Sequence, residues 1–173
     1  MKNIIKSYVV GFILLILASG CASVHTKKEI FEIFNAKGFD TTLTERGLVV
    51  FLPELFFEFD SAVLTQPAHD QLVTISDVLT DPRTITEKIL VGGHADFLGD
   101  ETYNNALSLR RANVVADVLV LGGVNDNRIT RRGFGRKYPI APNTTPDGLD
   151  NPEGRSQNRR VEIVLEDPTP QQL

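Results

Sequence analysis

The sequence predicts an α/β fold in which strands alternate with amphipathic helices and a final strand closes the domain. An apolar strand signal at 88–94 leads through a short acidic loop into a helical pattern at 102–121, and residues 159–165 alternate as a strand does. The 173 residues leave room for one ordinary domain plus a leader, and 42% hydrophobic with 23% charged residues is a globular composition.

The N-terminus is predicted to be a secretory signal peptide that covers residues 1–20. Lys2 and Lys6 precede an uninterrupted apolar run at 8–18, which is too short for a comfortable transmembrane span and is followed by small residues and Cys21. Cys21 is the only cysteine, so a disulfide within the chain is impossible.

Residues 17–21, Leu-Ala-Ser-Gly-Cys, resemble a bacterial lipobox. The resemblance implies that Cys21 is acylated as the mature N-terminus, which would anchor the chain to a membrane without a spanning helix. Ala22 stands where the usual inner-membrane retention signal has Asp, so the resemblance implies export to the outer membrane. Ordinary signal-peptidase cleavage beside an unrelated thiol is the alternative.

Residues 21–46 are expected to form an arm that contains the lipidated cysteine, a short polar tether, a helix and a hairpin. The helix is predicted at 27–37 from its apolar side, with Gly38 at its end. The hairpin is predicted from strand signals at 39–44 and 48–52 around a Glu-Arg-Gly turn.

Aromatic residues dominate the next segment, 55–60, where Phe57 and Phe59 are predicted to be core residues. A helix follows at 65–79, because its apolar residues recur at helical spacing, and it should end at Asp81-Pro82.

The strand at 88–94 is apolar on both faces and is predicted to be the central strand of the sheet. The helix at 102–121 should end at Gly122-Gly123, and 129–135 should form the next strand. The turn-rich segment 139–152 is interpreted as an inserted surface loop.

In the last strand, 159–165, alternation directs Arg159 to the same face as the apolar residues and places Arg160 and Glu162 on the other face. Residues 168–173 form a polar tail with little to bury.

The helix at 102–121 carries a charge on its apolar face. At about 100° per residue, Arg111 falls among apolar side chains, and Asn104 lies almost in line with it. A buried charge needs a partner, and the nearest candidate is Asp96 in the preceding loop. Two interpretations follow: an Asp96–Arg111 ion pair that pins the loop, or a pocket for a ligand that carries both an amine and a carboxylate.

This stretch resembles the signature of a known family, and the residues that carry the resemblance are Gly93-His94-Ala95-Asp96, Gly99, Tyr103-Asn104, Leu107-Ser108 and Arg111-Ala112. They are similar to the OmpA-like peptidoglycan-binding domain, which peptidoglycan-associated lipoproteins, OmpA C-terminal domains and flagellar stator proteins share. The resemblance extends from about residue 47 to residue 166. It implies a mixed sheet with helices packed mainly on one face, in the order β-α-β-α-β-loop-β, over residues 47–167.

The resemblance also implies a ligand, the diaminopimelate residue of a peptidoglycan stem peptide, whose side-chain end carries an ammonium and a carboxylate. Asp96 would bind the ammonium, and Arg111 would bind the carboxylate through charge-assisted hydrogen bonds. The other implied site residues are Ala95 through its backbone, Asn104 through hydrogen bonds, and Asp60 and Arg159 at the polar rim.

Patterns for cofactor, metal or catalytic chemistry are weak. His94 and Asp96 could be two metal ligands, but a third is not evident, and His94 is interpreted as a packed, hydrogen-bonded strand residue. Ser108 lacks the nucleophile-elbow pattern, the acidic segment 147–153 lacks EF-hand spacing, and there is no glycine-rich phosphate loop. No cofactor, metal or enzymatic activity is predicted.

The chain has a cluster of basic residues, Arg128, Arg131, Arg132, Arg136 and Lys137. Removal of residues 1–20 takes away two lysines, which leaves 16 basic and 22 acidic residues. Because the mature chain is acidic and the cluster has no stacking aromatics, we expect a solvated basic face and no nucleic-acid partner.

The expected function is noncatalytic attachment of the outer membrane to peptidoglycan, with lipid at one end and the pocket at the other. One alternative is a peptidoglycan-binding subunit of a larger envelope complex, such as a Tol-Pal-like or secretion system. An alternative of another class is a cell-wall hydrolase, which would need a positioned acid and base that the sequence does not supply.

Overall fold

The structure is a computed structural model that describes residues 26–84 and 87–166. Its helices are α1 (Lys27–Ala36), α2 (Gln66–Thr80), α3 (Glu101–Leu121) and α4 (Pro152–Asn158), with short 3-10 turns η1 (Glu54–Phe56) and η2 (Asp126–Arg128). Its strands are β1 (Thr41–Thr44), β2 (Gly47–Pro53), β3 (Ile89–His94), β4 (Ile129–Gly135) and β5 (Arg160–Glu166). The signal peptide, Cys21 and the tail at 168–173 lie outside the described residues.

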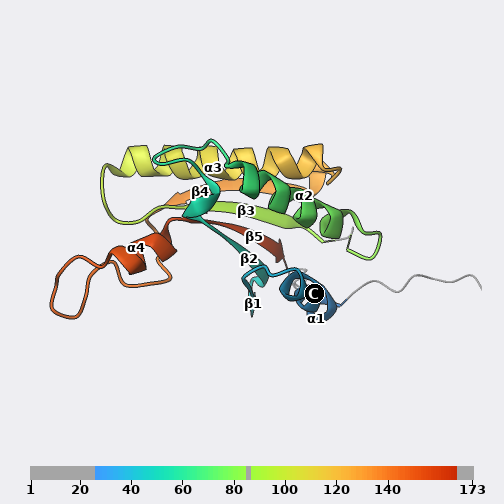
Figure 1. The fold of residues 1–173 in the computed structure, drawn as a ribbon, viewed down its shortest axis with the longest axis horizontal. Coiled ribbons are helices and arrows are strands. Elements are labelled where there is room, and N and C mark those ends of the chain that lie inside the picture. Colours follow the sequence, from blue (N-terminus) through green and yellow to red (C-terminus); the bar gives the residue numbers. More distant parts are fainter. Residues whose placement is uncertain (1–25, 85–86, 167–173) are drawn as a thin grey trace, which may run out of the picture.

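The described strands form one mixed sheet in the order β1-β2-β5-β3-β4. The β3–β4 pair is parallel, and the other pairs are antiparallel. Helices α2 and α3 lie along one face of the sheet (Figure 1). The predicted α/β fold, with a mixed sheet and helices mainly on one face, is therefore confirmed.

The position of β3 within the sheet differs from the prediction. β3 lies between β5 and β4, and β5 occupies the middle of the sheet. The sequence signal was burial on both faces, which any interior strand satisfies, so it could not tell one interior strand from another.

Helix starts follow local capping chemistry. Thr26 accepts from the Glu29 main-chain N–H, and the Glu29 carboxylate accepts from the Thr26 N–H, which makes a capping box at the start of α1. Thr65 caps α2, and Asp100 caps α3 through the Tyr103 N–H at 2.9 Å. The helices predicted at 27–37, 65–79 and 102–121 are confirmed to within a residue or so at each end.

The N-terminal helix packs onto the rest of the domain, a point that the sequence left open. Ile30 and Phe34 of α1 are fully buried in the same core as β2 and α2. Lys27 donates to the Leu165 carbonyl oxygen at 2.8 Å and lies 3.3 Å from Glu87, at the end of β5 and the start of β3. The division of the chain into an arm at 21–46 and a domain at 47–167 stays a prediction.

Glycines let α3 lie close against the sheet. A Cβ atom on Gly93 would collide with the Ser108 carbonyl oxygen, and a Cβ atom on Gly133 would lie 2.7 Å from the main-chain nitrogen of Leu109. This close approach places the first turns of α3 directly beside the carboxyl end of β3.

Two sequence predictions need correction. Phe57 is buried as expected, but Phe59 is 97% exposed. The chain turns at Asp60, which has φ 48°, and Phe57 pairs with Leu64 across this turn, so the tip that carries Phe59 points away from the core. Helix α4 differs from the prediction of a loop over 139–152: Asn151-Pro152 lies at the end of that segment and also makes an N-cap followed by proline.

The segment between β4 and α4 lies largely at the surface, as expected for 139–152, and Thr144 pairs with Asp150 across it. The last strand alternates as predicted, with Arg160 and Glu162 on the face opposite the core. Along 26–84 and 87–166, no helix is both long and apolar enough to cross a membrane.

Candidate functional site

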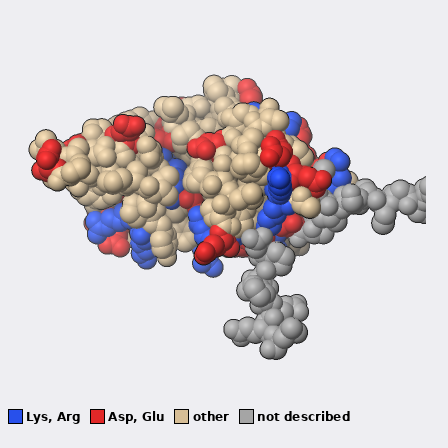
Figure 2. All heavy atoms as spheres, turned by 90° about the horizontal axis from the view of Figure 1, so that it is seen from below, with Lys and Arg blue, Asp and Glu red and all other residues tan. Residues whose placement is uncertain are grey.

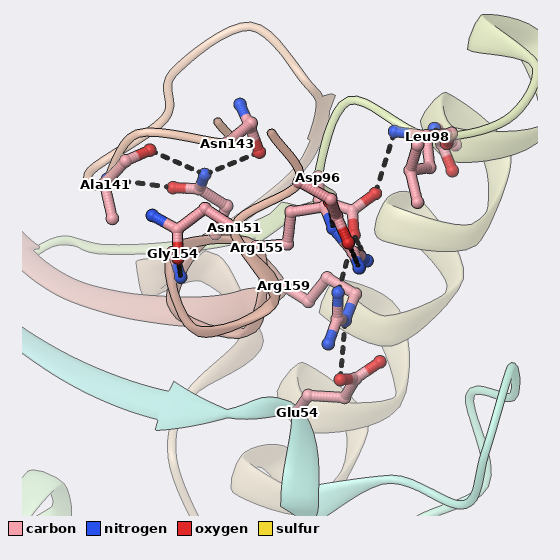
Figure 3. Close-up of polar contacts among 12 residues, drawn as sticks. Glu54, Asp96, Leu98, Ala141, Asn143, Asn151, Gly154, Arg155 and Arg159 are labelled. Atoms are coloured by element: carbon pink, nitrogen blue, oxygen red, sulfur yellow. Dashed lines mark hydrogen bonds and ion pairs between the residues drawn. The ribbon is translucent and has the colours of Figure 1, made fainter. Parts of the chain in front are cut away.

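A pocket of about 400 Å³ lies at the carboxyl end of β3, between the start of α3, the segment after β2, and α4 (Figure 3). The six residues predicted to bind the ligand line it: Asp60, Ala95, Asp96, Asn104, Arg111 and Arg159. Glu54, Phe59, Leu98, Gly99, Tyr103, Leu107 and Arg155 complete the lining.

Asp96 is the most strongly held acid of the pocket. Its side chain is buried, and Oδ1 accepts from the Leu98 main-chain N–H at 2.9 Å. Oδ2 accepts from Arg159 Nη1 at 2.5 Å and from Arg155 Nη1 at 3.2 Å. The interpretation of an Asp96–Arg111 ion pair is therefore wrong: both ion-pair partners of Asp96 belong to the α4 region.

Each of these arginines is shared with a second carboxylate. Arg155 donates from Nε and Nη2 to the two carboxylate oxygens of Asp150, both at 2.8 Å, and Arg159 Nε donates to Glu54 Oε2 at 2.5 Å. The result is an alternating series of charges, Asp150–Arg155–Asp96–Arg159–Glu54, with Asp96 at its centre. Figure 3 labels the part of the series from Arg155 to Glu54. The hydrogen bonds with Asp150 raise the pKa of Arg155, and the same contact lowers the pKa of Asp150.

Arg111 faces the other side of the pocket. Its side chain is buried, its Nε donates to the Ser61 carbonyl oxygen at 2.8 Å, and its guanidinium carbon lies 4.9 Å from the centre of the Phe57 ring. Burial lowers the pKa of Arg111, while Glu54 and Asp60 act against that shift. Its Nη groups make no hydrogen bond to any residue of the described chain, so they are available to a ligand.

Asp60 and Asn104 shape the mouth of the pocket. Asp60 adopts a left-handed conformation that is costly for a non-glycine residue, and its Oδ1 accepts from the Tyr103 hydroxyl at 2.8 Å. This hydrogen bond raises the pKa of Tyr103. Asn104 Nδ2 donates to the Leu98 carbonyl at 2.6 Å and thereby holds the loop before α3.

The backbone of Ala95 is partly committed to the fold. Its N–H donates to the Gly135 carbonyl oxygen at 2.8 Å, across the bulge that follows Gly93. A main-chain contact from Ala95 to a ligand would therefore use its carbonyl oxygen.

Sequence reasoning missed Glu54 and Arg155 in the pocket. A signal for Arg155 was present: it lies four residues before Arg159, behind the Asn151-Pro152 helix start, and residues four apart share one side of a helix. Glu54 carried no such signal, because its role depends on how η1 packs beside Arg159.

The remaining polar candidates are structural. His94 is buried and stacks on Phe134 with ring centres 5.1 Å apart, but its Nε2 lies 3.6 Å from Glu162, beyond hydrogen-bond distance. It is packed as predicted, without the expected hydrogen bond. No group of side chains suited to a metal ion is found among the residues that the structure describes.

The expected solvated basic face is wrong for Arg128. This side chain is buried and donates to the carbonyl oxygens of Leu79, Thr84 and Glu87 at 2.7 to 2.9 Å. Arg131 pairs with Asp126 at 2.7 Å. Acidic and basic side chains are also interspersed on the face seen in Figure 2.

An α/β sandwich with a charged, partly buried pocket at the end of an interior strand defines a ligand-binding domain. The sequence profile of the OmpA family matches residues 56–152, and the chain belongs to this family. Its relatives include a peptidoglycan-binding protein and a cell wall anchor.

Among its relatives, the putative lipoprotein YfiB of Escherichia coli is 35% identical over 88% of this chain and 92% of its own length. The peptidoglycan-binding protein ArfA of Mycobacterium tuberculosis is 45% identical over 63% of this chain and 31% of its own. The solved cell wall anchor of the T6SS from Pseudomonas aeruginosa is 27% identical with a TM-score of 0.62, covering 83% of this chain and 99% of that one. Other curated relatives are longer, and the chain spans only 14% of one of them and 56% of another.

Proposed function

We propose that this protein is an outer-membrane lipoprotein that binds peptidoglycan without catalysis and so attaches the membrane to the cell wall. The observation that carries the proposal is the pocket itself, which presents Arg111 with free donors opposite the buried carboxylate of Asp96, with Glu54 and Asp60 in the same lining. The names of two relatives, a peptidoglycan-binding protein and a cell wall anchor, support the same chemistry.

The proposed ligand is the free end of diaminopimelate in a stem peptide, where one carbon carries an ammonium and a carboxylate. The ligand carboxylate would bind the free Nη groups of Arg111 in a charge-assisted contact. The ammonium would lie against Asp96, with Asp60 on the same rim. Asn104 and Arg159 would complete the polar lining, and the Ala95 carbonyl would accept a further hydrogen bond.

Attachment to the membrane would be through acylated Cys21 after removal of residues 1–20. Only residues 22–25 separate that cysteine from the cap of α1, so the domain would stay close to its anchor. Helices α1 and α4 lie at opposite ends of the sheet (Figure 1), and α4 supplies Arg155 to the pocket, which suits a protein that joins two surfaces.

Calorimetric titration of the full chain, purified in detergent, with L-Ala-γ-D-Glu-meso-diaminopimelate tests this proposal. We expect saturable binding and a loss of about 30-fold or more in Arg111→Ala, because truncation leaves the ligand carboxylate without its charged partner. Asp96→Asn should also weaken binding.

Arg110→Ala is the matched control, since Arg110 is the exposed neighbour on the same helix and should bind as wild type does. Absence of binding by folded wild type, or release of muropeptides from purified walls, would contradict the proposal.

A second candidate is a wall-binding subunit of a larger envelope complex. The likeness to the T6SS cell wall anchor over nearly all of that chain favours it. Cross-linking in intact cells, followed by purification of the Arg111→Ala variant, would distinguish the two: a protein partner that remains bound without wall binding supports the complex.

A further inference from the structure

The surface loop before α4 is fixed to the same helix that supplies the pocket with arginines. Asn158 is completely buried, and its Oδ1 accepts from the main-chain N–H groups of Ile140 and Ala141 at 2.8 and 3.1 Å. Asn151 caps α4 and also donates to the Pro142 carbonyl oxygen at 2.9 Å. The position of the loop is therefore coupled to the position of Arg155.

Asp150, in this loop, does not line the pocket, but it competes for an arginine that does. Arg155 makes a two-point contact with Asp150 at 2.8 Å and only one, longer contact with Asp96 at 3.2 Å. A guanidinium held by two carboxylates neutralises each of them only in part. Asp96 thus keeps more of its negative charge than it would if Arg155 belonged to it alone.

We propose that Asp150 is a positioning residue which, by taking the two-point contact of Arg155 and leaving Asp96 only the single longer one, sets the preference of the pocket for a ligand end that carries an ammonium beside its carboxylate. This inference rests on the proposed function, because it assigns a specificity determinant to the same pocket. Asp150 lies outside the pocket lining: its side chain is half exposed, and Arg155 is its strongest partner.

The test compares two tripeptides by calorimetry with the full chain: one ends in meso-diaminopimelate, and the other in 2-aminopimelate, which keeps the carboxylate but lacks the distal amine. In Asp150→Asn, Arg155 is released to pair fully with Asp96. We expect the Kd for the diaminopimelate peptide to rise about fivefold, the scale of one partly exposed ion pair, and the Kd for the aminopimelate peptide not to rise.

Two further variants separate this role from simple loop folding. Asp147→Asn removes a charge from the same loop at an exposed residue with no ion pair or side-chain hydrogen bond to the described chain, and it should bind both peptides as wild type does. Asp150→Glu keeps a carboxylate that can pair with Arg155, so it should retain the preference for the diaminopimelate peptide over the aminopimelate peptide.

An equal loss of affinity for both peptides would show a merely structural role and overturn the inference. Unchanged or tighter binding of the diaminopimelate peptide by Asp150→Asn would overturn it as well, while leaving the proposed function standing. Failure of wild type to bind either peptide would instead overturn both.

Discussion

Asp60 combines a conformational cost with a place in the pocket. Within the described chain it is the only non-glycine residue with positive φ. Such strain at a site is usually retained because the side chain is needed there, and here the carboxylate is held by the Tyr103 hydroxyl.

Asp60→Gly and Asp60→Ala separate the two effects. Both remove the carboxylate and should weaken binding of the diaminopimelate peptide equally. Asp60→Ala should be less stable than Asp60→Gly by about 1 kcal/mol, because only glycine adopts the left-handed conformation without steric cost. Urea unfolding measures the difference, and equal stability of the two variants would show that the turn relaxes.

A single residue could be placed from sequence when the pattern of its own helix or strand indicated which face it occupies. Arg111 and Asn104 were assigned to the buried side of one helix from periodicity, and both are buried. The partners of Asp96 could not be found in this way, because Arg155 and Arg159 follow it by 59 and 63 residues and reach it only through the docking of α4.

The close packing of helix α3 against the sheet requires that residue 93 has no side chain. Gly93→Ala would drive a methyl group into the Ser108 carbonyl, and backbone cannot move aside as a flexible side chain can. We expect a loss of about 3 kcal/mol in the free energy of unfolding, the upper range for overpacking.

The comparison for Gly93→Ala is Ala106→Ser on the exposed side of the same helix, which should change stability by less than about 0.5 kcal/mol. A tolerated Gly93→Ala would mean that α3 can shift away from β3, and the geometry of the pocket would then be less rigid than the packing implies.

The elements that sequence reasoning recovered, such as α2 and α3, are long and end at turn residues: Asp81-Pro82 follows α2, and Gly122-Gly123 follows α3. Helix α4 is short and has no apolar stripe; its buried residues are Gly154 and Asn158. Its existence depends on the Asn151 cap and on contacts with the preceding loop, which periodicity does not register.

The stability of the whole domain should depend on pH through the middle of the sheet. Burial would raise the pKa of Glu162, but interactions with His94 and Arg160 lower it from 4.5 to about 2. A depressed pKa in the folded state stabilises the protein above the unfolded value and loses that contribution as pH falls toward the folded value.

We therefore expect the difference in unfolding free energy between wild type and Glu162→Gln to shrink as pH falls from 4.5 to 2. Denaturant unfolding at a series of pH values measures it. A difference that stays constant down to pH 2 would show that Glu162 titrates normally in the folded protein.

The placement of α1 and α4 at opposite ends of the sheet has a mechanical consequence. In the proposed attachment, tension between membrane and wall enters near Lys27, beside the start of β3, and leaves at the carboxyl end of the same strand. Hydrogen bonds between strands lie across that pulling direction, so they bear the load together in shear. A pulled molecule should therefore release its ligand or its lipid before the sheet ruptures.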